Sequence, residues 1–204
     1  MKRANLVLVL LIAIFAFNNF ATAQPKIKKT TKLKQKYVTL SPTAGLIFPI
    51  ADFGNNYKSG FTVGLDMGYR INKEVGFYGR FGYMSIGSKI EAPAGSTEIP
   101  DGKFLEFSAG PRYFMTDPKL SSTLFLEGGV GAYMFSQDAY TLAGPVTVLE
   151  QKSTKLGVSA GIGANLAVSK NIDILIKTKF HNVFSDGGST SFITALGGIE
   201  FKIR

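Results

Sequence analysis

The chain has 204 residues, a net charge of +9 and no cysteine. This length suits one domain, and the lack of cysteine excludes both a disulfide framework and a thiolate metal site. Only 18% of the residues are charged, whereas the chain contains 23 glycines, 17 phenylalanines and 8 tyrosines. This balance is unusual for a secreted soluble domain.

Residues 1–23 have the pattern of a secretory signal peptide. Lys2 and Arg3 precede the apolar run "NLVLVLLIAIFAF", and the small residues "ATA" close it. The run is too short for a comfortable membrane span, which argues against an N-terminal anchor. We therefore expect cleavage between Ala23 and Gln24.

Residues 24–36 contain six lysines and no acidic residue. A run of like charges is typical of a tail rather than of a packed segment. Such a tail is suited to contact anionic lipid head groups or peptidoglycan. The alternative, which the sequence leaves open, is that it only keeps the chain soluble before membrane insertion.

The stretch "GFTVGLDMGYRI", residues 60–71, alternates between two kinds of residue. Large apolar side chains occupy every second position, and glycine, threonine or a charged residue lies between them. A period of two predicts a β-strand whose two faces meet different environments. The same alternation recurs in residues 37–49, 75–87, 103–115, 123–136, 154–168, 172–184 and 191–203.

The second face of these strands decides the fold class. It holds many of the glycines and nearly all of the strand charges, which suits the narrow interior of an eight-stranded barrel. The large apolar faces then turn towards lipid. A soluble lipocalin-like barrel would reverse the faces, but its exterior should carry more Lys, Glu, Thr and Gln than these faces do.

We therefore predict an all-β fold, an eight-stranded antiparallel up-and-down transmembrane β-barrel, over residues 37–204. The connections alternate between long and short, as in barrels of the Gram-negative outer membrane, whose short turns and termini are periplasmic. This places residues 24–36 in the periplasm as a basic tail. Val146, Val148 and Ile90 predict that some strand continues beyond the membrane through the long connections.

Charged residues on the inward face should pair with one another, because an isolated buried charge is costly. Asp66 shares this face, and the predicted lumen ion-pair network comprises Arg70, Arg80, Glu106, Arg112, Glu127, Lys155, Asp173, Lys177, Lys179, Glu200 and Lys202. The alternative is that the same charges line a water channel.

Hairpin geometry predicts individual pairs within this network. The turn near residue 119 should place Arg112 directly opposite Glu127. The same rule applied to the preceding hairpin places Arg80 beside Gly110, one diagonal step from Arg112. Glu127 would then compensate both arginines.

Aromatic residues should form a belt at each membrane interface. We expect one belt at Tyr69, Phe77, Tyr113 and Phe201, and the other at Phe48, Phe61, Phe104 and Phe184.

The stretch "GLIFPIADFGNNYKSGFTVGLDMGYRINKEVGFYGRFGYMSI" resembles the opening of small outer-membrane β-barrel domain proteins. The layout over residues 37–204 is similar to that of OmpA/OmpX-type eight-stranded barrels. This resemblance implies surroundings of membrane lipids and lipopolysaccharide, and assembly by the barrel assembly machinery. That machinery often reads a terminal aromatic residue, whereas here Phe201 lies three residues before the end. The resemblance also implies partner binding by strand addition at exposed edges.

Some barrels of this architecture are enzymes that modify lipid A, and acyl chemistry of that kind needs a base and a nucleophile. The sole histidine, His181, is followed by Asn182 and Val183 rather than by a serine at the required spacing. We predict no catalytic, cofactor-binding or metal-binding residue, and no nucleic-acid partner, because the basic charge lies in the lumen and the tail.

The sequence thus predicts a non-catalytic outer-membrane barrel with a structural or surface-interaction role, such as adhesion or binding. Two alternatives remain open. One is a lipid A-modifying enzyme, and the other is a component of an envelope or secretion machine with an extracellular or periplasmic protein partner.

Overall fold

The computed structural model describes residues 36–89, 99–115, 122–141, 147–185 and 188–203. All of them lie in the compact unit Lys34–Arg204. The predicted signal peptide and nearly all of the predicted tail lie outside the described residues.

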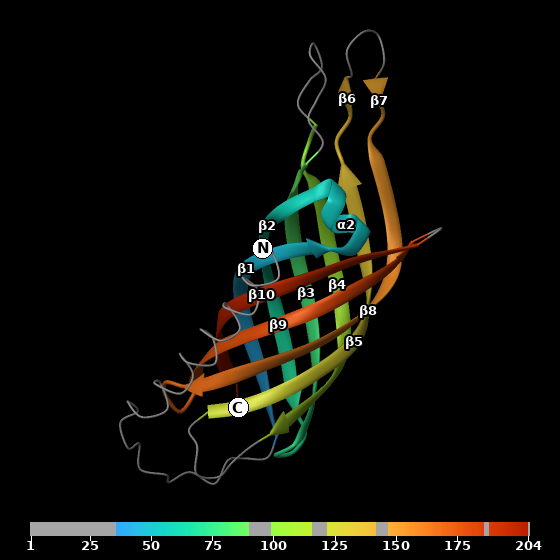
Figure 1. The fold of residues 1–204 in the computed structure, drawn as a ribbon. Coiled ribbons are helices and arrows are strands. Elements are labelled where there is room, and N and C mark those ends of the chain that lie inside the picture. Colours follow the sequence, from blue (N-terminus) through green and yellow to red (C-terminus); the bar gives the residue numbers. More distant parts are fainter. Residues whose placement is uncertain (1–35, 90–98, 116–121, 142–146, 186–187, 204) are drawn as a thin grey trace, which may run out of the picture. The chain divides into compact units, whose positions relative to one another are not determined.

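Eight antiparallel strands close into a barrel in the order β1-β10-β9-β8-β5-β4-β3-β2 (Figure 1). The strands are β1 (Tyr37–Ile50), β2 (Tyr57–Arg70), β3 (Val75–Ser88), β4 (Gly102–Met115), β5 (Ser122–Gln137), β8 (Gln151–Ala167), β9 (Ile172–Ser185) and β10 (Gly188–Ile203). The predicted fold class is confirmed, and each barrel strand pairs with its neighbours along the chain. The largest difference from the predicted bounds is at the starts of β2, β8 and β10, which begin at residues 57, 151 and 188 rather than 60, 154 and 191.

The two ends of the barrel differ. At the turn end, β2 passes into β3 through residues 71–74, and β8 passes into β9 through residues 168–171. The side chain of Asn72 closes the first of these turns, because its Oδ1 atom accepts hydrogen bonds from the amides of Glu74 and Val75 at 2.8 and 2.7 Å. This is the turn chemistry for which asparagine is favoured.

At the loop end, the connections carry structure of their own. The predicted loop after β1 contains the short helix α2 (Ala51–Asn56), and a two-stranded sheet, β6 (Tyr140–Thr141) and β7 (Thr147–Val148), lies between β5 and β8. Figure 1 shows β6 and β7 beyond the closed barrel, in line with β5 and β8. The predicted continuation of a strand is therefore present at Val148, whereas Val146 and Ile90 lie outside the described residues.

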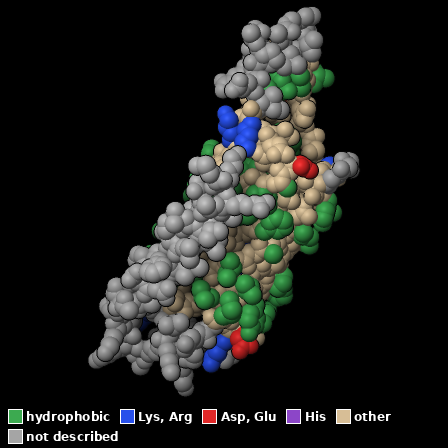
Figure 2. Space-filling view, in the orientation of Figure 1, with side chains coloured by type: hydrophobic (Ala, Val, Ile, Leu, Met, Phe, Trp, Pro, Cys, Tyr) green, Lys and Arg blue, Asp and Glu red, His purple; other side chains and the backbone are tan. Residues whose placement is uncertain are grey.

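The strand faces point as the alternation predicts. On the outside, Leu65 is 37% and Ile162 is 48% exposed, whereas Arg80 and Glu106 are buried. Figure 2 shows hydrophobic side chains spread over the outer surface of the barrel, with charged side chains near its two ends. The soluble alternative required the reverse orientation and is wrong. Among the described residues, no helix has the length and apolarity needed to cross a membrane.

The predicted aromatic belts need one correction. The turn-end belt residues are all exposed on the outer face, as are Phe48, Phe61 and Phe184 at the loop end. Phe104 is only 4% exposed and lies inside the barrel. It is an even-numbered residue of β4 and shares the inward face of Glu106, so its assignment to the belt was wrong.

An arginine on the outer face should destabilise the barrel according to its depth in the membrane. We expect Leu65→Arg, in the middle of β2, to lower the free energy of unfolding by about 2–4 kcal/mol. The matched control is Val168→Arg, directly after β8 at the turn end, which should lower it by only about 0–1 kcal/mol. The chain has no tryptophan, so the measurement is a urea titration in lipid vesicles with the folded fraction read from gel migration. Equal effects of the two variants would contradict the assigned membrane position.

Candidate functional site

The interior of the barrel is filled in three layers. A loop-end apolar cluster consists of Ile47, Met84, Ile86, Phe104, Tyr133, Val183 and Phe192. A turn-end apolar cluster consists of Phe114, Phe125 and Leu175. Between them lies the ionic layer, which consists of Asp66, Arg80, Glu106, Arg112, Glu127, Lys177, Lys179 and Glu200.

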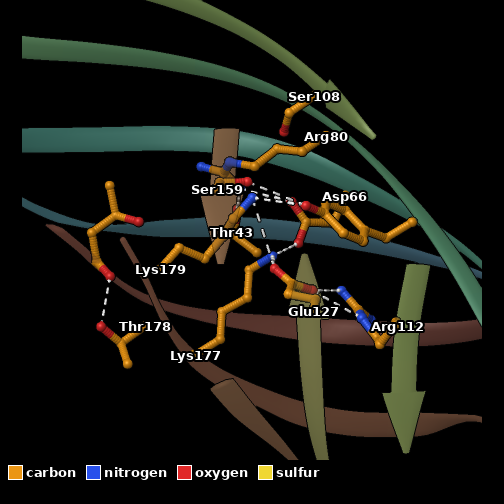
Figure 3. A network of polar contacts seen from close by, with 12 residues as sticks. Thr43, Asp66, Arg80, Ser108, Arg112, Glu127, Ser159, Lys177, Thr178 and Lys179 are labelled. Carbon is orange, nitrogen blue, oxygen red and sulfur yellow. Dashed lines mark hydrogen bonds and ion pairs between the residues drawn. The ribbon is translucent and has the colours of Figure 1, made fainter. Parts of the chain in front are cut away.

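Arg80 joins two carboxylates of the ionic layer, and Figure 3 labels one of them, Asp66. Its Nη1 atom lies 2.7 Å from Oδ1 of Asp66, and its Nε atom lies 3.1 Å from Oε2 of Glu106. The same Nη1 atom donates a hydrogen bond to Thr43 at 2.8 Å. The guanidinium plane therefore meets acceptors from β1, β2 and β4, which fits the fork geometry of arginine.

Glu127 forms the second centre of the ionic layer. Arg112 donates two hydrogen bonds to its Oε2 atom, from Nε at 2.9 Å and from Nη2 at 2.6 Å. Lys177 lies 3.1 Å from the other oxygen and also binds Asp66, so it connects the two centres. Lys179 completes the layer at 3.5 Å from Glu106 and 3.8 Å from Glu127.

The ionic layer contains four carboxylates and four cations, and none of these eight residues is more than 5% exposed. Their formal charges therefore cancel within the layer. Neutrality and close contact are what offset the cost of removing these groups from water. Such burial indicates a filled interior rather than a wide aqueous pore.

Glycine on the inward face provides the space for these long side chains. A Cβ atom at Gly163 would lie 2.3 Å from Cζ of Phe125 and 2.7 Å from Cβ of Lys177. A Cβ atom at Gly64 would lie 3.0 Å from Nη2 of Arg80. Only a residue without a side chain permits such an approach.

Of the two predicted oppositions of residues, one is present in the structure and the other is wrong. Arg112 lies opposite Glu127 in the register of β4 and β5. Arg80 lies opposite Ser108, two residues from the expected Gly110. It therefore pairs with Asp66 and Glu106, and the prediction that Glu127 compensates Arg80 was wrong. The error arose because the long connection between β3 and β4 does not fix the centre of the hairpin.

Four residues of the predicted network lie outside the ionic layer. Arg70 lies at the turn end, where it donates to the hydroxyl of Tyr37 and to the carbonyl of Asn72, both at 3.1 Å. Asp173 and Lys202 form a separate ion pair at 2.6 Å, also at the turn end. Lys155 lies at the loop end, where its side chain lines a cavity.

Two contributors to the ionic layer were not predicted. The ring of Tyr78 lies 4.8 Å from Nζ of Lys179 and 5.5 Å from Cζ of Arg112, within the range of cation–π attraction. Asn165 donates to Oε1 of Glu200 at 2.7 Å. Neither residue is charged, so the only signal in the sequence was that each occupies an inward-facing position of its strand.

His181 is fully buried between the ionic layer and the loop-end apolar cluster. Its Nδ1 atom lies 3.0 Å from the hydroxyl of Tyr133, and its Nε2 atom lies 3.1 Å from the hydroxyl of Thr194. Its ring stacks on Phe192 with 4.6 Å between centroids. Within the part of the chain that the structure describes, no cluster of three His, Cys, Asp or Glu residues is arranged to hold a metal ion.

The loop end contains a cavity of about 220 Å³. Its lining residues are Phe53, Tyr57, Phe104, Tyr133, Phe135, Ser153, Lys155, Val183, Ser185 and Thr190. At the turn end, a hollow of about 10 Å³ lies beside Arg70, Arg112 and Glu200. Its volume is close to that of a single water site.

Comparison with known proteins decides the family. The family model described as "Outer membrane protein beta-barrel domain" matches residues 7–199 of the chain. The protein belongs to this outer-membrane β-barrel family. It is therefore an outer-membrane protein, and the resemblance seen in the sequence is confirmed.

Solved structures of other small outer-membrane barrels are similar to this family member. Neisserial surface protein A is 19% identical, with a TM-score of 0.59, and the match covers 82% of this chain and 97% of that chain. OprG of Pseudomonas aeruginosa is 12% identical, with a TM-score of 0.55 and coverage of 83% and 96%. The attachment invasion locus protein Ail of Yersinia pestis is 17% identical, with a TM-score of 0.51 and coverage of 84% and 100%. A search of curated protein sequences finds no significant match.

The two centres of the ionic layer permit a test by double substitution. Glu127→Gln should destabilise the outer-membrane barrel by about 3–5 kcal/mol, because it leaves buried cations without their carboxylate. Adding Arg112→Met should recover part of this loss, because it removes one of those cations. The measurement is a double-mutant cycle of unfolding free energies on lipid-folded protein. A coupling energy of zero would show that the pair is hydrated, and the interpretation of a filled interior would fail.

The inward glycines permit a second test with a matched control. Gly163→Ala should lower the free energy of unfolding by about 1–3 kcal/mol, because the new methyl group overlaps Phe125 and Lys177. Gly197→Ala is the control, since a Cβ atom there has no neighbour within 4 Å. This control should change the free energy by no more than about 0.5 kcal/mol. If neither substitution changes the free energy of unfolding in the urea titration, the close packing around Gly163 is contradicted.

Proposed function

We propose that this outer-membrane barrel is a non-catalytic surface protein that binds an extended segment of another protein at the free edge of β8. The observation that carries this proposal is a difference in pairing. β8 pairs with β5 from Gln151 onwards, but its described pairing with β9 begins only at Gly157. Residues 151–156 therefore pair on one side, and no described residue pairs with them on the other.

An unpaired strand edge offers a row of backbone donors and acceptors to a further strand. Apolar side chains near this edge would add contact area to the backbone hydrogen bonds. Leu156 is 70% exposed and Leu149 is 77% exposed. Beyond the barrel, β6 pairs with β7, so the hairpin formed by β5 and β8 continues past the last pair between Gln137 and Gln151.

The interior supports the role of an anchor rather than a channel. The neutral ionic layer and the two apolar clusters fill the barrel, so the loop end is the part available for binding. We propose that the loop end faces the exterior and that both termini lie in the periplasm, because the connections at the turn end are the shorter ones. The outer face would meet membrane lipids and lipopolysaccharide. Two of the similar structures are named as a surface protein and as an attachment protein, which accords with this role.

The alternative functions have less support. A lipid A-modifying enzyme needs a base that substrate can reach, whereas His181 is buried and both of its ring nitrogens are engaged by hydroxyl groups. A role in an envelope machine rests on residues 24–36, which lie almost entirely outside the described residues.

Site-specific photocrosslinking tests the free edge. A photoreactive amino acid at Thr154, within the edge, should give a covalent adduct with a partner protein in whole cells. The same amino acid at Ile174, on the outer face of β9, is the matched control and should give no such adduct. Deletion of residues 139–149 should reduce the yield of the adduct, because it removes the exposed side chain of Leu149, and should leave heat-modifiable gel migration, and thus the barrel, intact. Equal labelling at Thr154 and Ile174 would contradict the proposal.

A further inference from the structure

Two strand pairs of the barrel are interrupted near their middle, and a proline lies at each interruption. The described pairing of β1 with β10 leaves out residues 41–42, which include Pro42. The described pairing of β4 with β5 leaves out residues 110–111, which include Pro111. By contrast, the pairing of β2 with β3 is unbroken from Gly60 to Arg70.

Proline accounts for both interruptions, because it has no N–H to donate to a neighbouring strand. Within sheets it is therefore confined largely to edge strands, with its nitrogen facing away from the sheet. On its other side each proline lies in a paired stretch, Pro42 opposite Leu65 of β2 and Pro111 opposite Phe77 of β3. Strands β1 to β4 thus resemble one sheet with a proline at each edge.

The barrel is accordingly made of two four-stranded halves that meet at two seams. The first half consists of β1, β2, β3 and β4, and the second half consists of β5, β8, β9 and β10. We call the junction of β1 with β10 the closing seam, and the junction of β4 with β5 the hairpin seam.

The ionic layer is divided equally between the two halves. Each half contributes two carboxylates and two cations, so formal charge cancels within each half as well as within the layer. Movement of one half relative to the other therefore separates no net charge. The first half contributes Asp66, Arg80, Glu106 and Arg112, and the second half contributes Glu127, Lys177, Lys179 and Glu200.

The two seams differ in strength. Across the hairpin seam, Arg112 lies directly opposite Glu127 and donates two hydrogen bonds to it, and β4 and β5 follow one another along the chain. Because β1 and β10 are the first and last strands, no turn joins them. Small residues meet at the closing seam, where Ala44 lies opposite Gly197 and a Cβ atom at Gly197 would have no neighbour within 4 Å. The closing seam is therefore the weaker of the two.

An ion pair inside the barrel spans the closing seam. Asp66 belongs to β2 and Lys177 to β9, and these strands flank β1 and β10 on either side. The ammonium group of Lys177 binds the carboxylate of Asp66, and both side chains are buried (Figure 3). This contact ties the two halves together across the lumen, next to the seam where backbone pairing is interrupted.

We propose that the closing seam is a lateral gate. β1 and β10 separate towards the lipid, while each half stays folded and turns about the hairpin seam. The ion pair of Asp66 with Lys177 is the latch that holds the gate shut. This gate is distinct from the free edge of β8, because residues 151–156 take no part in it.

Hydrogen exchange of backbone amides, measured by NMR on the full protein in lipid nanodiscs, tests the gate. The amides of residues 41–44 and 197–200 should exchange at least about tenfold faster than those of residues 64–66 and 80–82, because local opening exposes them. The second group is the reference within the same molecule. It lies at the same level of the barrel, since Pro42 is opposite Leu65 and Leu65 is opposite Phe81.

Replacement of each proline separates the gate from the hinge. Pro42→Val restores a donor towards β10, so exchange at the closing seam should slow by about fivefold. Pro111→Val is the matched control, because Pro111 is also exposed on the outer face but lies at the hairpin seam. It should leave exchange at the closing seam unchanged. Lys177→Met removes the latch and should speed exchange at the closing seam more than in the reference group.

A cross-link provides a second measurement, because the chain has no cysteine of its own. Ala44→Cys with Gly197→Cys, joined by a short bifunctional thiol reagent before reconstitution, should slow exchange at the closing seam to the rate of the reference group. Thr178→Cys with Ala195→Cys is the matched control, because these exposed residues lie opposite each other within the second half. It should have no such effect.

Three results would overturn the proposal. The first is exchange at the closing seam that is no faster than in the reference group. The second is an equal slowing by Pro42→Val and Pro111→Val. The third is an equal slowing by the two cross-links.

Discussion

Eight charged side chains share an interior that is too narrow to hydrate them, and the other features of the barrel follow from this constraint. Each charge must find its partner within the layer, because removing one ion of such a group from water costs several kcal/mol. Four carboxylates and four cations meet this requirement only if the strands keep one register. The pairing of Arg112 with Glu127 across β4 and β5, and of Arg80 with Asp66 across β2 and β3, fixes that register at two places.

The ionic layer also explains the distribution of glycine. Gly163 lies opposite Lys177 in the pairing of β8 and β9, and Gly161 lies opposite Lys179. The side chain of each lysine lies next to the opposing glycine of β8, where no side chain occupies the space. Long charged residues and glycine are thus paired across strands, which leaves room for each lysine side chain. A strand with large residues at both positions would not close around this layer.

Much of this arrangement was accessible from the sequence. A period of two fixes which face turns to lipid, and short connections fix the register, so the opposition of Arg112 and Glu127 followed from the hairpin between β4 and β5. The partner of Arg80 did not follow, because the connection from β3 to β4 is long and its centre is not determined by turn geometry. The apolar clusters at the two ends were missed for another reason. Phe114, Phe125 and Phe192 lie at inward positions, but alternation alone does not distinguish a lumen filled by rings from one filled by glycine and charge.

The neutrality of the ionic layer has a consequence at the loop end. Because the four cations of the layer are matched by carboxylates beneath the apolar cluster, they contribute little net field to the cavity above it. Lys155 is opposite Tyr133 in the register of β5 and β8, and it lies within residues 151–156, for which no pairing with β9 is described. This short segment of β8 thus has two different surfaces, one formed by its inward side chains and one formed by its backbone groups. Ser153 and Lys155 face the cavity, while the backbone groups of residues 151–156 face outward along the sheet. Where the described pairing with β9 stops, the same stretch of β8 is able to present side chains to the cavity and backbone groups to the proposed partner strand, which a strand paired on both sides cannot do.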